Sequence, residues 1–197
     1  MTNRRNITPI LLSAFILALP AWSAPSDVNP CPSEAEKGAN RSTVVAFGPE
    51  ENPEALILRL IDSARTSIHL SAFSFSSAPI IEALIRAHQR GVDVAVVVDR
   101  KHNVDDDTKG IGQRALAQLV RSDIAVRTNA NYRIHHDKFM VVDDRHVETG
   151  SYNFSPSANK NSENVLIICN SPQLAARYVD HWGKRFAEAA DFRDARK

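Results

Sequence analysis

The chain has 197 residues, of which 43% are hydrophobic and 24% are charged, a composition typical of one ordinary globular domain. Its 24 basic and 23 acidic residues give a formal net charge of +1, which excludes binding of nucleic acid through a strong overall positive charge. Two cysteines, Cys31 and Cys169, are too few for a disulfide-rich scaffold or for a zinc ribbon with paired Cys-x-x-Cys motifs.

The N-terminal segment has the pattern of a secretory signal peptide. Arg4 and Arg5 precede an uncharged stretch whose apolar centre, Ile10–Leu19, is about half as long as the roughly 20 residues of a membrane-spanning helix. Small residues follow, and we expect cleavage after Ser23. An uncleaved N-terminal anchor is the alternative. We therefore interpret residues 1–23 as a signal peptide and expect a periplasmic or secreted protein without stable membrane insertion.

Export would change both the charge and the cysteine chemistry. Removal of two arginines and no acid leaves 22 basic and 23 acidic residues, so the net charge becomes −1. In an oxidising compartment Cys31 and Cys169 can pair, which would tie an N-terminal tail (residues 24–41) to the end of a late strand. Two unpaired thiols, with Cys169 in the core, are the alternative. Pairing is slightly favoured.

Strand and helix patterns alternate along residues 42–191, which we interpret as one catalytic domain. Apolar runs predict strands at residues 44–47, 67–73, 92–98, 124–126, 138–142, 147–149 and 165–168. Apolar residues at helical spacing predict helices that start at Pro53, Pro79, about residue 111 and Ser171–Pro172. Residues 99–110 are expected to form a polar loop. This order predicts an α/β fold with a mixed sheet sandwiched between helices.

The residues best suited to chemistry begin at His136. His136 and Lys138 lie two residues apart at the start of a strand, so they share one face. An ammonium beside an imidazole attracts an anion and lowers the imidazole pKa, which favours the neutral, nucleophilic form. Gly150 and Ser151 form a turn that can bring a backbone N–H and a hydroxyl to the same place, and Asn153 adds a neutral donor. Together these groups predict a phosphate site.

The spacing of these residues resembles the HKD motif of the phospholipase D superfamily: His136-x-Lys138-x4-Asp143-x6-Gly150-Ser151-x-Asn153. The run Thr149–Ser155, followed by Asn161–Asn164, is most similar to the small secreted bacterial endonucleases of that superfamily. The resemblance covers about residues 43–189 and implies a phospholipase D-like fold.

The resemblance also implies a role for each motif residue. Catalytic roles fall to His136, Lys138, Asp143 and Glu163, and phosphate-binding roles to Lys138, Ser151 and Asn153. His136 would be the nucleophile and form a covalent phosphohistidine. Lys138 and Asn153 would hold the nonbridging phosphate oxygens. Glu163 would orient His136 through its other ring nitrogen, and Asp143 would orient rather than react. The resemblance implies no metal or other cofactor.

A chain with one copy of the motif does not itself supply a general acid to protonate the leaving group. In-line displacement at phosphorus puts the leaving group opposite the nucleophile, where a second group must protonate it. We therefore expect a homodimer whose twofold axis passes through a shared active site, so that His136 of the partner subunit is the acid. The expected function is a metal-independent, non-specific endonuclease that cleaves DNA, with RNA as a further candidate substrate.

Three other functions remain open. The same chemistry could act on phospholipid head groups, or the chain could bind nucleic acid without catalysis. A metallohydrolase could use His135, His136, Asp143 and Asp144, although these residues lack a recognised ligand spacing.

Several residues near the motif have two interpretations. Tyr132, Arg133, Tyr152, Phe154 and Lys160 could track a nucleic-acid strand, or they could be ordinary loop and core residues. Three consecutive acids, Asp105–Asp107, are interpreted as a solvated loop and a helix start rather than as a metal site.

Overall fold

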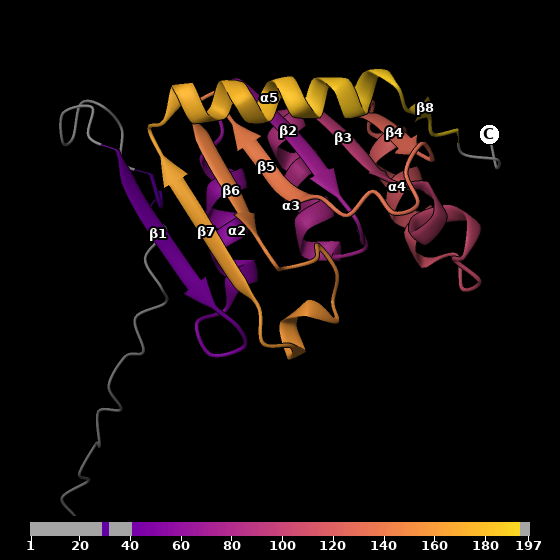
Figure 1. Ribbon diagram of the computed structural model, residues 1–197, viewed down its shortest axis with the longest axis horizontal. Coiled ribbons are helices and arrows are strands. Elements are labelled where there is room, and N and C mark those ends of the chain that lie inside the picture. The colour runs from indigo at the N-terminus through magenta and orange to yellow at the C-terminus, as the bar shows by residue number, and fades with distance from the viewer. Residues whose placement is uncertain (1–28, 32–40, 194–197) are drawn as a thin grey trace, which may run out of the picture.

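A mixed β-sheet forms the centre of the computed structural model, which describes residues 29–31 and 41–193 (Figure 1). Within these residues the sheet has eight strands in the order β1-β7-β6-β5-β2-β3-β4-β8. They are β1 (Ser42–Phe47), β2 (Ser67–Ala72), β3 (Asp93–Asp99), β4 (Ala125–Asn129), β5 (Lys138–Val142), β6 (His146–Gly150), β7 (Asn164–Cys169) and β8 (Ala190–Asp191). Strands β2, β3 and β4 are parallel and the other neighbours antiparallel, which confirms the mixed sheet. The short strand β8 was not expected from the sequence.

Helices cover both faces of the sheet. Three of them, α2 (Pro53–Ser63), α3 (Ala78–Gln89) and α4 (Ile111–Arg121), pack on one face, and α5 (Pro172–Ala187) runs along the other (Figure 1). Among the described residues, no helix has the length and apolar character needed to cross a membrane. The signal peptide expected at residues 1–23 and most of the tail at 24–41 lie outside the described residues.

Strand β3 shows how the two layers share one core strand. Val94, Val96 and Val98 belong to the apolar cluster under α2, α3 and α4, whereas Ala95 and Val97 belong to the cluster under α5. A strand buried on both faces needs apolar residues at nearly every position. The nearly continuous apolar run at residues 92–98, interrupted by the exposed Asp93, is therefore explained.

The helix ends agree with the sequence in part. The Asn52 side chain caps α2 by accepting a hydrogen bond from the Ala55 N–H at 3.1 Å, with Pro53 following it as expected. Ser171 occupies the corresponding position before α5, but its side chain makes no capping hydrogen bond. The residue of α5 that is most deeply buried among its large side chains is Trp182, whose Nε1 donates to the Leu70 carbonyl at 3.0 Å.

The expectation of a plain loop at residues 99–110 is wrong. Residues Lys101–Asp105 form a π-helical turn, η1, directly after β3. Its Asn103 side chain donates to the Asp99 carbonyl at 2.7 Å and to the Phe73 carbonyl at 2.6 Å. Asp107 accepts hydrogen bonds from the N–H groups of Ile111 and Gln113, so it caps α4 as the helix-start interpretation predicts.

The disulfide is present. Cys31 and Cys169 are bonded across 138 residues of sequence, and both are almost fully buried. The bridge ties residues 29–31 to the end of β7, as the slightly favoured alternative predicted.

Glu148 is an acid buried between apolar residues of the core. Glu148 on β6 is 1% exposed and its Oε2 has no hydrogen-bond partner. It pairs across the sheet with Met140 and Ile167, which belong to the cluster under α2 and α3. Burial raises the pKa of Glu148 to about 8, against a smaller opposing effect of a backbone hydrogen bond from Met140. The folded protein therefore keeps this carboxyl protonated at pH 7.

Replacement of Glu148 by Gln should make stability less dependent on pH. The unfolded chain loses the Glu148 proton near its ordinary pKa of 4.5, whereas the folded chain holds it to about pH 8. As the pH rises between these two pKa values, this group alone should therefore lower the free energy of unfolding of the wild type by about 1.4 kcal/mol per pH unit. Denaturant unfolding at pH 5 and pH 7 measures the difference. Glu82→Gln, at an exposed position of α3, is the control, and equal pH dependence in the two variants would contradict the assignment.

Candidate active site

Three strand ends meet at one edge of the sheet. Strand β5 begins at Lys138, β6 ends at Gly150 and β7 begins at Asn164. The antiparallel register pairs Phe139 with Thr149 and Gly150 with Val165, so these ends lie side by side. Motif residues separated by up to 27 positions (136 to 163) are thereby brought to the same edge of the sheet.

Lys138 supplies a positive charge beside the imidazole of His136. The Lys138 Nζ lies 3.2 Å from the His136 Nε2 and 3.2 Å from the His136 carbonyl oxygen. Burial lowers the pKa of His136, and the Lys138 charge lowers it further. Burial also lowers the pKa of Lys138, while the carboxylates of Glu163 and Asp137 oppose that shift. The imidazole is therefore neutral at neutral pH, and it is exposed to solvent.

A phenylalanine that the sequence analysis did not assign to the site packs against this pair. The Phe73 ring centre lies 4.7 Å from that of His136 and 5.5 Å from the Lys138 Nζ. The Phe73 ring also contacts His102 of η1, with 4.3 Å between the two ring centres. Phe73 follows β2, so the only sequence signal was its place at the end of a predicted strand.

Ser151 and Glu163 contact each other rather than His136. The Ser151 Oγ donates to the Glu163 Oε2 at 2.5 Å, and the Asn161 side chain donates to the Glu163 Oε1 at 3.1 Å. The structure gives no hydrogen bond between Glu163 and His136 within this chain. The orienting role implied for Glu163 is therefore not realised inside one subunit. The Ser151 N–H is also occupied, because it donates to the Asn164 carbonyl at 3.1 Å.

Gly150 allows this close packing of chain segments. A Cβ at this position would stand 2.1 Å from the Asn164 carbonyl oxygen, well inside van der Waals contact. The glycine is therefore needed because the start of β7 passes against it, and not for the free turn that the sequence suggested. The Ser151 hydroxyl lies at this junction of β6 and β7, where it also accepts a hydrogen bond from the Asn164 N–H at 3.0 Å.

Asn153 is half-buried and its Oδ1 is a buried atom without a hydrogen-bond partner. The aromatic residues on each side of it are core residues, Tyr152 at 1% and Phe154 at 0% exposure. The Tyr152 hydroxyl donates to the Asn159 side chain at 2.5 Å, and Phe154 pairs with Phe75 in an isolated bridge. Neither ring is available to stack on a nucleic-acid base, whereas Tyr132, Arg133 and Lys160 are exposed.

The structure does not bring Asp143 into the site. Asp143 follows the last residue of β5, roughly 16 Å along the strand from Lys138. Its carboxylate accepts hydrogen bonds of 2.7–3.2 Å from the N–H groups of residues 65–67 and from the Thr66 hydroxyl. Burial by itself would raise the pKa of Asp143, but these hydrogen bonds outweigh it and lower the pKa. The catalytic role expected for Asp143 is therefore wrong, because the residue lies at the far end of β5 from His136. The Asp143 carboxylate instead anchors the start of β2.

The alternative metal site fails for the same reason. Asp143 and Asp144 lie at the β5–β6 turn, whereas His135 and His136 precede the other end of β5. These four side chains therefore cannot bind one ion together. Among the described residues, one group of three or more potential ligands lies close together, Cys31, His146 and Cys169, and its two sulfurs are joined in the disulfide.

A hydrogen-bonded network supports the site from the α5 side. The Asp137 Oδ2 accepts from the Ser71 hydroxyl at 3.1 Å and contacts the His181 Nε2 at 3.0 Å. His135 is buried, with its Nε2 2.8 Å from the Ser71 Oγ and its N–H donating to Asp99 at 2.8 Å. Alternation along the chain sends Asp137 to the face opposite His136 and Lys138. This network positions the segment that contains His136 and the start of β5 at Lys138.

Comparisons with known proteins identify the family of the chain. Residues 57–186 match the family model described as "Cardiolipin synthase, PLD-like domain". A protein named phospholipase D from Rickettsia conorii is 37% identical over 150 residues, which is 75% of this chain and 72% of that protein. The mitochondrial cardiolipin hydrolase of Danio rerio is 33% identical over 136 residues, 68% of this chain and 57% of that protein.

Solved structures give the same result. Nuc from Salmonella typhimurium, a phospholipase D family member, matches with a TM-score of 0.74 and 41% identity over 78% of this chain and 99% of that chain. NucT from Helicobacter pylori, at 21% identity and a TM-score of 0.64, covers 78% of this chain and all of that chain (100%) and supports the fold alone. The fold is that of a phospholipase D-type hydrolase. The chain belongs to the phospholipase D superfamily.

Replacement of Gly150 by Ala should disrupt the junction between β6 and β7. The added methyl would overlap the Asn164 carbonyl, so the two strands must separate, at a cost of about 1–3 kcal/mol or more in the free energy of unfolding. Denaturant unfolding measures this loss. Gly183→Ala in α5 is the matched control: nothing lies within 4 Å of its Cβ, and Ala should stabilise the helix by about 0.5–1 kcal/mol. Equal stability of the two variants would show that the close approach imposes no constraint.

Proposed function

We propose that the chain is a secreted, metal-independent phosphodiesterase that cleaves DNA, and RNA as a further substrate, through a phosphohistidine on His136. The observation that carries the proposal is the neutral, exposed imidazole of His136 with the Lys138 ammonium 3.2 Å from its ring. A neutral ring nitrogen can attack phosphorus, and the ammonium offsets the negative charge of the diester as the nucleophile approaches.

The proposed reaction has two displacements. A ring nitrogen of His136 forms a bond to phosphorus while the bond from phosphorus to the leaving oxygen breaks, and that oxygen takes a proton from an imidazolium on the opposite side. A water molecule then attacks phosphorus in the phosphohistidine and gives a proton to the imidazole on the opposite side, which lost its own proton in the first step. The bond between phosphorus and nitrogen breaks, and His136 leaves with the electron pair. One strand end leaves as a hydroxyl and the other as a phosphate. Lys138 and Asn153 are the proposed donors to the nonbridging oxygens.

The acid is proposed to be His136 of the partner subunit. The chain has one copy of the motif, so a twofold axis through the site would set two imidazoles on opposite sides of the phosphate. The negative charge of the bound phosphate favours protonation of one of the two. The same symmetry would allow Glu163 to reach the imidazole of the other subunit, which is consistent with its lack of contact with His136 in its own chain.

Phospholipid hydrolysis is the second candidate, and a specific observation favours it. Several relatives bear the names phospholipase D or mitochondrial cardiolipin hydrolase. The chemistry at phosphorus would be unchanged, and only the groups on either side of the phosphate would differ. Purified protein assayed in parallel on plasmid DNA and on phosphatidylglycerol or cardiolipin vesicles separates the two candidates.

Cleavage of plasmid DNA should persist in EDTA and should fall by at least about 1,000-fold in His136→Ala, because the nucleophile is removed. A nicking assay with and without chelator measures both effects. His88→Gln, on α3 away from the motif, is the control for general effects of replacing a histidine. Loss of wild-type cleavage in EDTA would contradict the metal-independent mechanism, and undiminished cleavage by His136→Ala would contradict the phosphohistidine.

If the two subunits share one active site, a single His136→Ala subunit should inactivate the whole dimer. When wild-type and His136→Ala chains are co-expressed in equal amounts and pair at random, about one quarter of the dimers keep both imidazoles, so about one quarter of the full activity should remain. Sites that act independently would keep about one half. Nicking activity against subunit ratio, with sedimentation to confirm dimers, distinguishes a quadratic from a linear dependence, and a linear one or an active monomer would overturn the shared site.

A further inference from the structure

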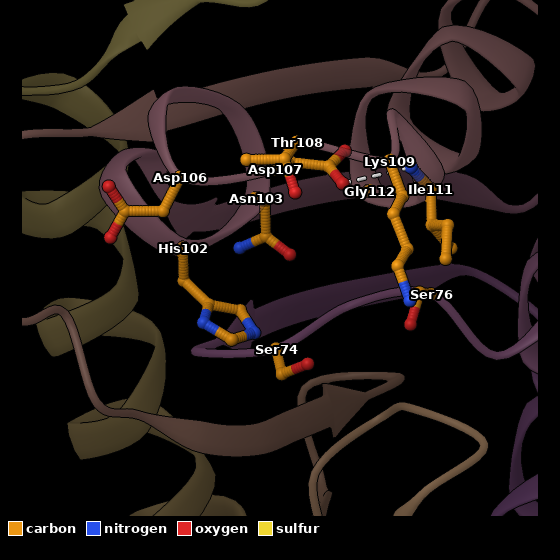
Figure 2. Close-up of a pocket in the computed structure, with 10 residues that line it drawn as sticks. All are labelled: Ser74, Ser76, His102, Asn103, Asp106, Asp107, Thr108, Lys109, Ile111 and Gly112. Atoms are coloured by element: carbon orange, nitrogen blue, oxygen red, sulfur yellow. Dashed lines mark hydrogen bonds between the residues drawn. The ribbon is translucent and has the colours of Figure 1, made fainter.

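A hollow of about 440 Å³ lies between the segment after β2 and the turn η1, with His102 and Ser74 in its lining (Figure 2). It is formed by the segment after β2, by the π-helical turn η1 and by the loop and first residues of α4. The polar side chains that line it include Ser74, Ser76, His102, Thr108 and Lys109. Its size falls within the range of pockets that bind small organic ligands.

A short chain of rings links the hollow to His136. Phe73 contacts the His136 ring at 4.7 Å and the His102 ring at 4.3 Å, measured between ring centres, so the two imidazoles are at most about 9 Å apart. His102 lines the hollow, and Ser74 directly follows Phe73. A substrate group in the hollow would therefore be a near neighbour of a phosphate held at His136.

The walls of the hollow are held by buried contacts. Asn103 is 2% exposed, and its side chain bonds the Phe73 carbonyl, the Asp99 carbonyl and the Phe75 N–H at 2.6–2.9 Å. Behind it, a Cβ on Gly112 would stand 2.7 Å from the Asn103 carbonyl oxygen, so α4 packs directly on η1. The hollow is thus preorganised rather than a gap between loose loops.

The acids at the hollow already have partners, whereas several donors do not. Asp107 caps α4, and Asp106 pairs with Lys101. Within residues 41–193, by contrast, the Lys109 ammonium, the His102 ring nitrogens and the Ser74 hydroxyl have no hydrogen-bond or ion-pair partner in the structure. Lys109 and Thr108 are exposed. The groups that remain for a ligand are an ammonium, an imidazole and hydroxyls.

We propose that this hollow is a subsite for the nucleotide next to the scissile phosphate, with Lys109 on the neighbouring phosphate and His102 and the hydroxyls on its sugar and base. The proposal rests on the nuclease function proposed above. Ammonium and hydroxyl groups are standard contacts to nucleic-acid phosphate and sugar, whereas the acyl chains of a lipid would desolvate these donors without replacing their hydrogen bonds. The hollow would therefore favour a polymer with a charged repeat.

Two substrates test the subsite apart from the chemistry. Bis(p-nitrophenyl) phosphate has the scissile diester and no neighbouring phosphate, whereas a single-stranded oligodeoxynucleotide has both. For the oligonucleotide, Lys109→Ala should lower kcat/KM by about tenfold and reduce the slope of its logarithm against the logarithm of salt concentration by about 0.7, because one phosphate contact is lost. Hydrolysis of bis(p-nitrophenyl) phosphate should not change. Lys184→Ala, an exposed lysine on α5 across the sheet, is the control and should affect neither.

Each contrary result has its own meaning. Cleavage of the oligonucleotide that is unaffected by Lys109→Ala overturns the subsite and leaves the nuclease function standing. Equal losses on both substrates overturn it too, because Lys109 would then act on the catalytic pair or the fold. Hydrolysis of bis(p-nitrophenyl) phosphate without oligonucleotide cleavage overturns the nuclease function and the nucleotide subsite together. Lys109-dependent turnover of phosphatidylglycerol vesicles in that case would assign the hollow to a lipid head group.

Discussion

The site depends on the register of three antiparallel strands. Because Lys138 begins β5, Gly150 ends β6 and Asn164 begins β7, the ladder that holds the sheet together also places the motif at one edge. The fit is tight at Gly150, where there is no room for a side chain against the Asn164 carbonyl. A slip of one residue in either pairing would turn Lys138 or Ser151 to the opposite face of the sheet.

Residues of the motif divide into those that lie at the candidate site and those that stabilise the surrounding strands. Asp143 belongs to the second kind, since its carboxylate binds the backbone at the start of β2 far from His136. Asp137 lies between two residues that face the site, yet it points toward α5 and contacts Ser71 and His181. Sequence proximity to the motif is therefore a poor guide to chemistry, whereas position in the strand alternation is a good one.

Much of the fold followed from sequence patterns because apolar periodicity reports burial directly. The strand at residues 92–98 and the cap at Asn52 are local signals that the structure confirms. The π-helical turn η1 was missed because its stability comes from Asn103 bonding to Phe73, 30 residues away. The separation of Glu163 from His136 was missed for a related reason: the preference of Glu163 for Ser151 depends on how the loop before β7 returns to the sheet.

The hollow beside the site is built from a different part of the chain than the catalytic pair. Strands β5, β6 and β7 position the groups that we propose act on phosphorus, while the exposed Lys109 and Thr108 lie on a short loop anchored behind by Asn103 and Gly112. On this proposal, mutations in that loop would change the groups that contact the substrate beside the phosphate without moving His136. Changes at a few exposed positions would then alter which substrate is accepted, while the strand ends keep the reaction the same.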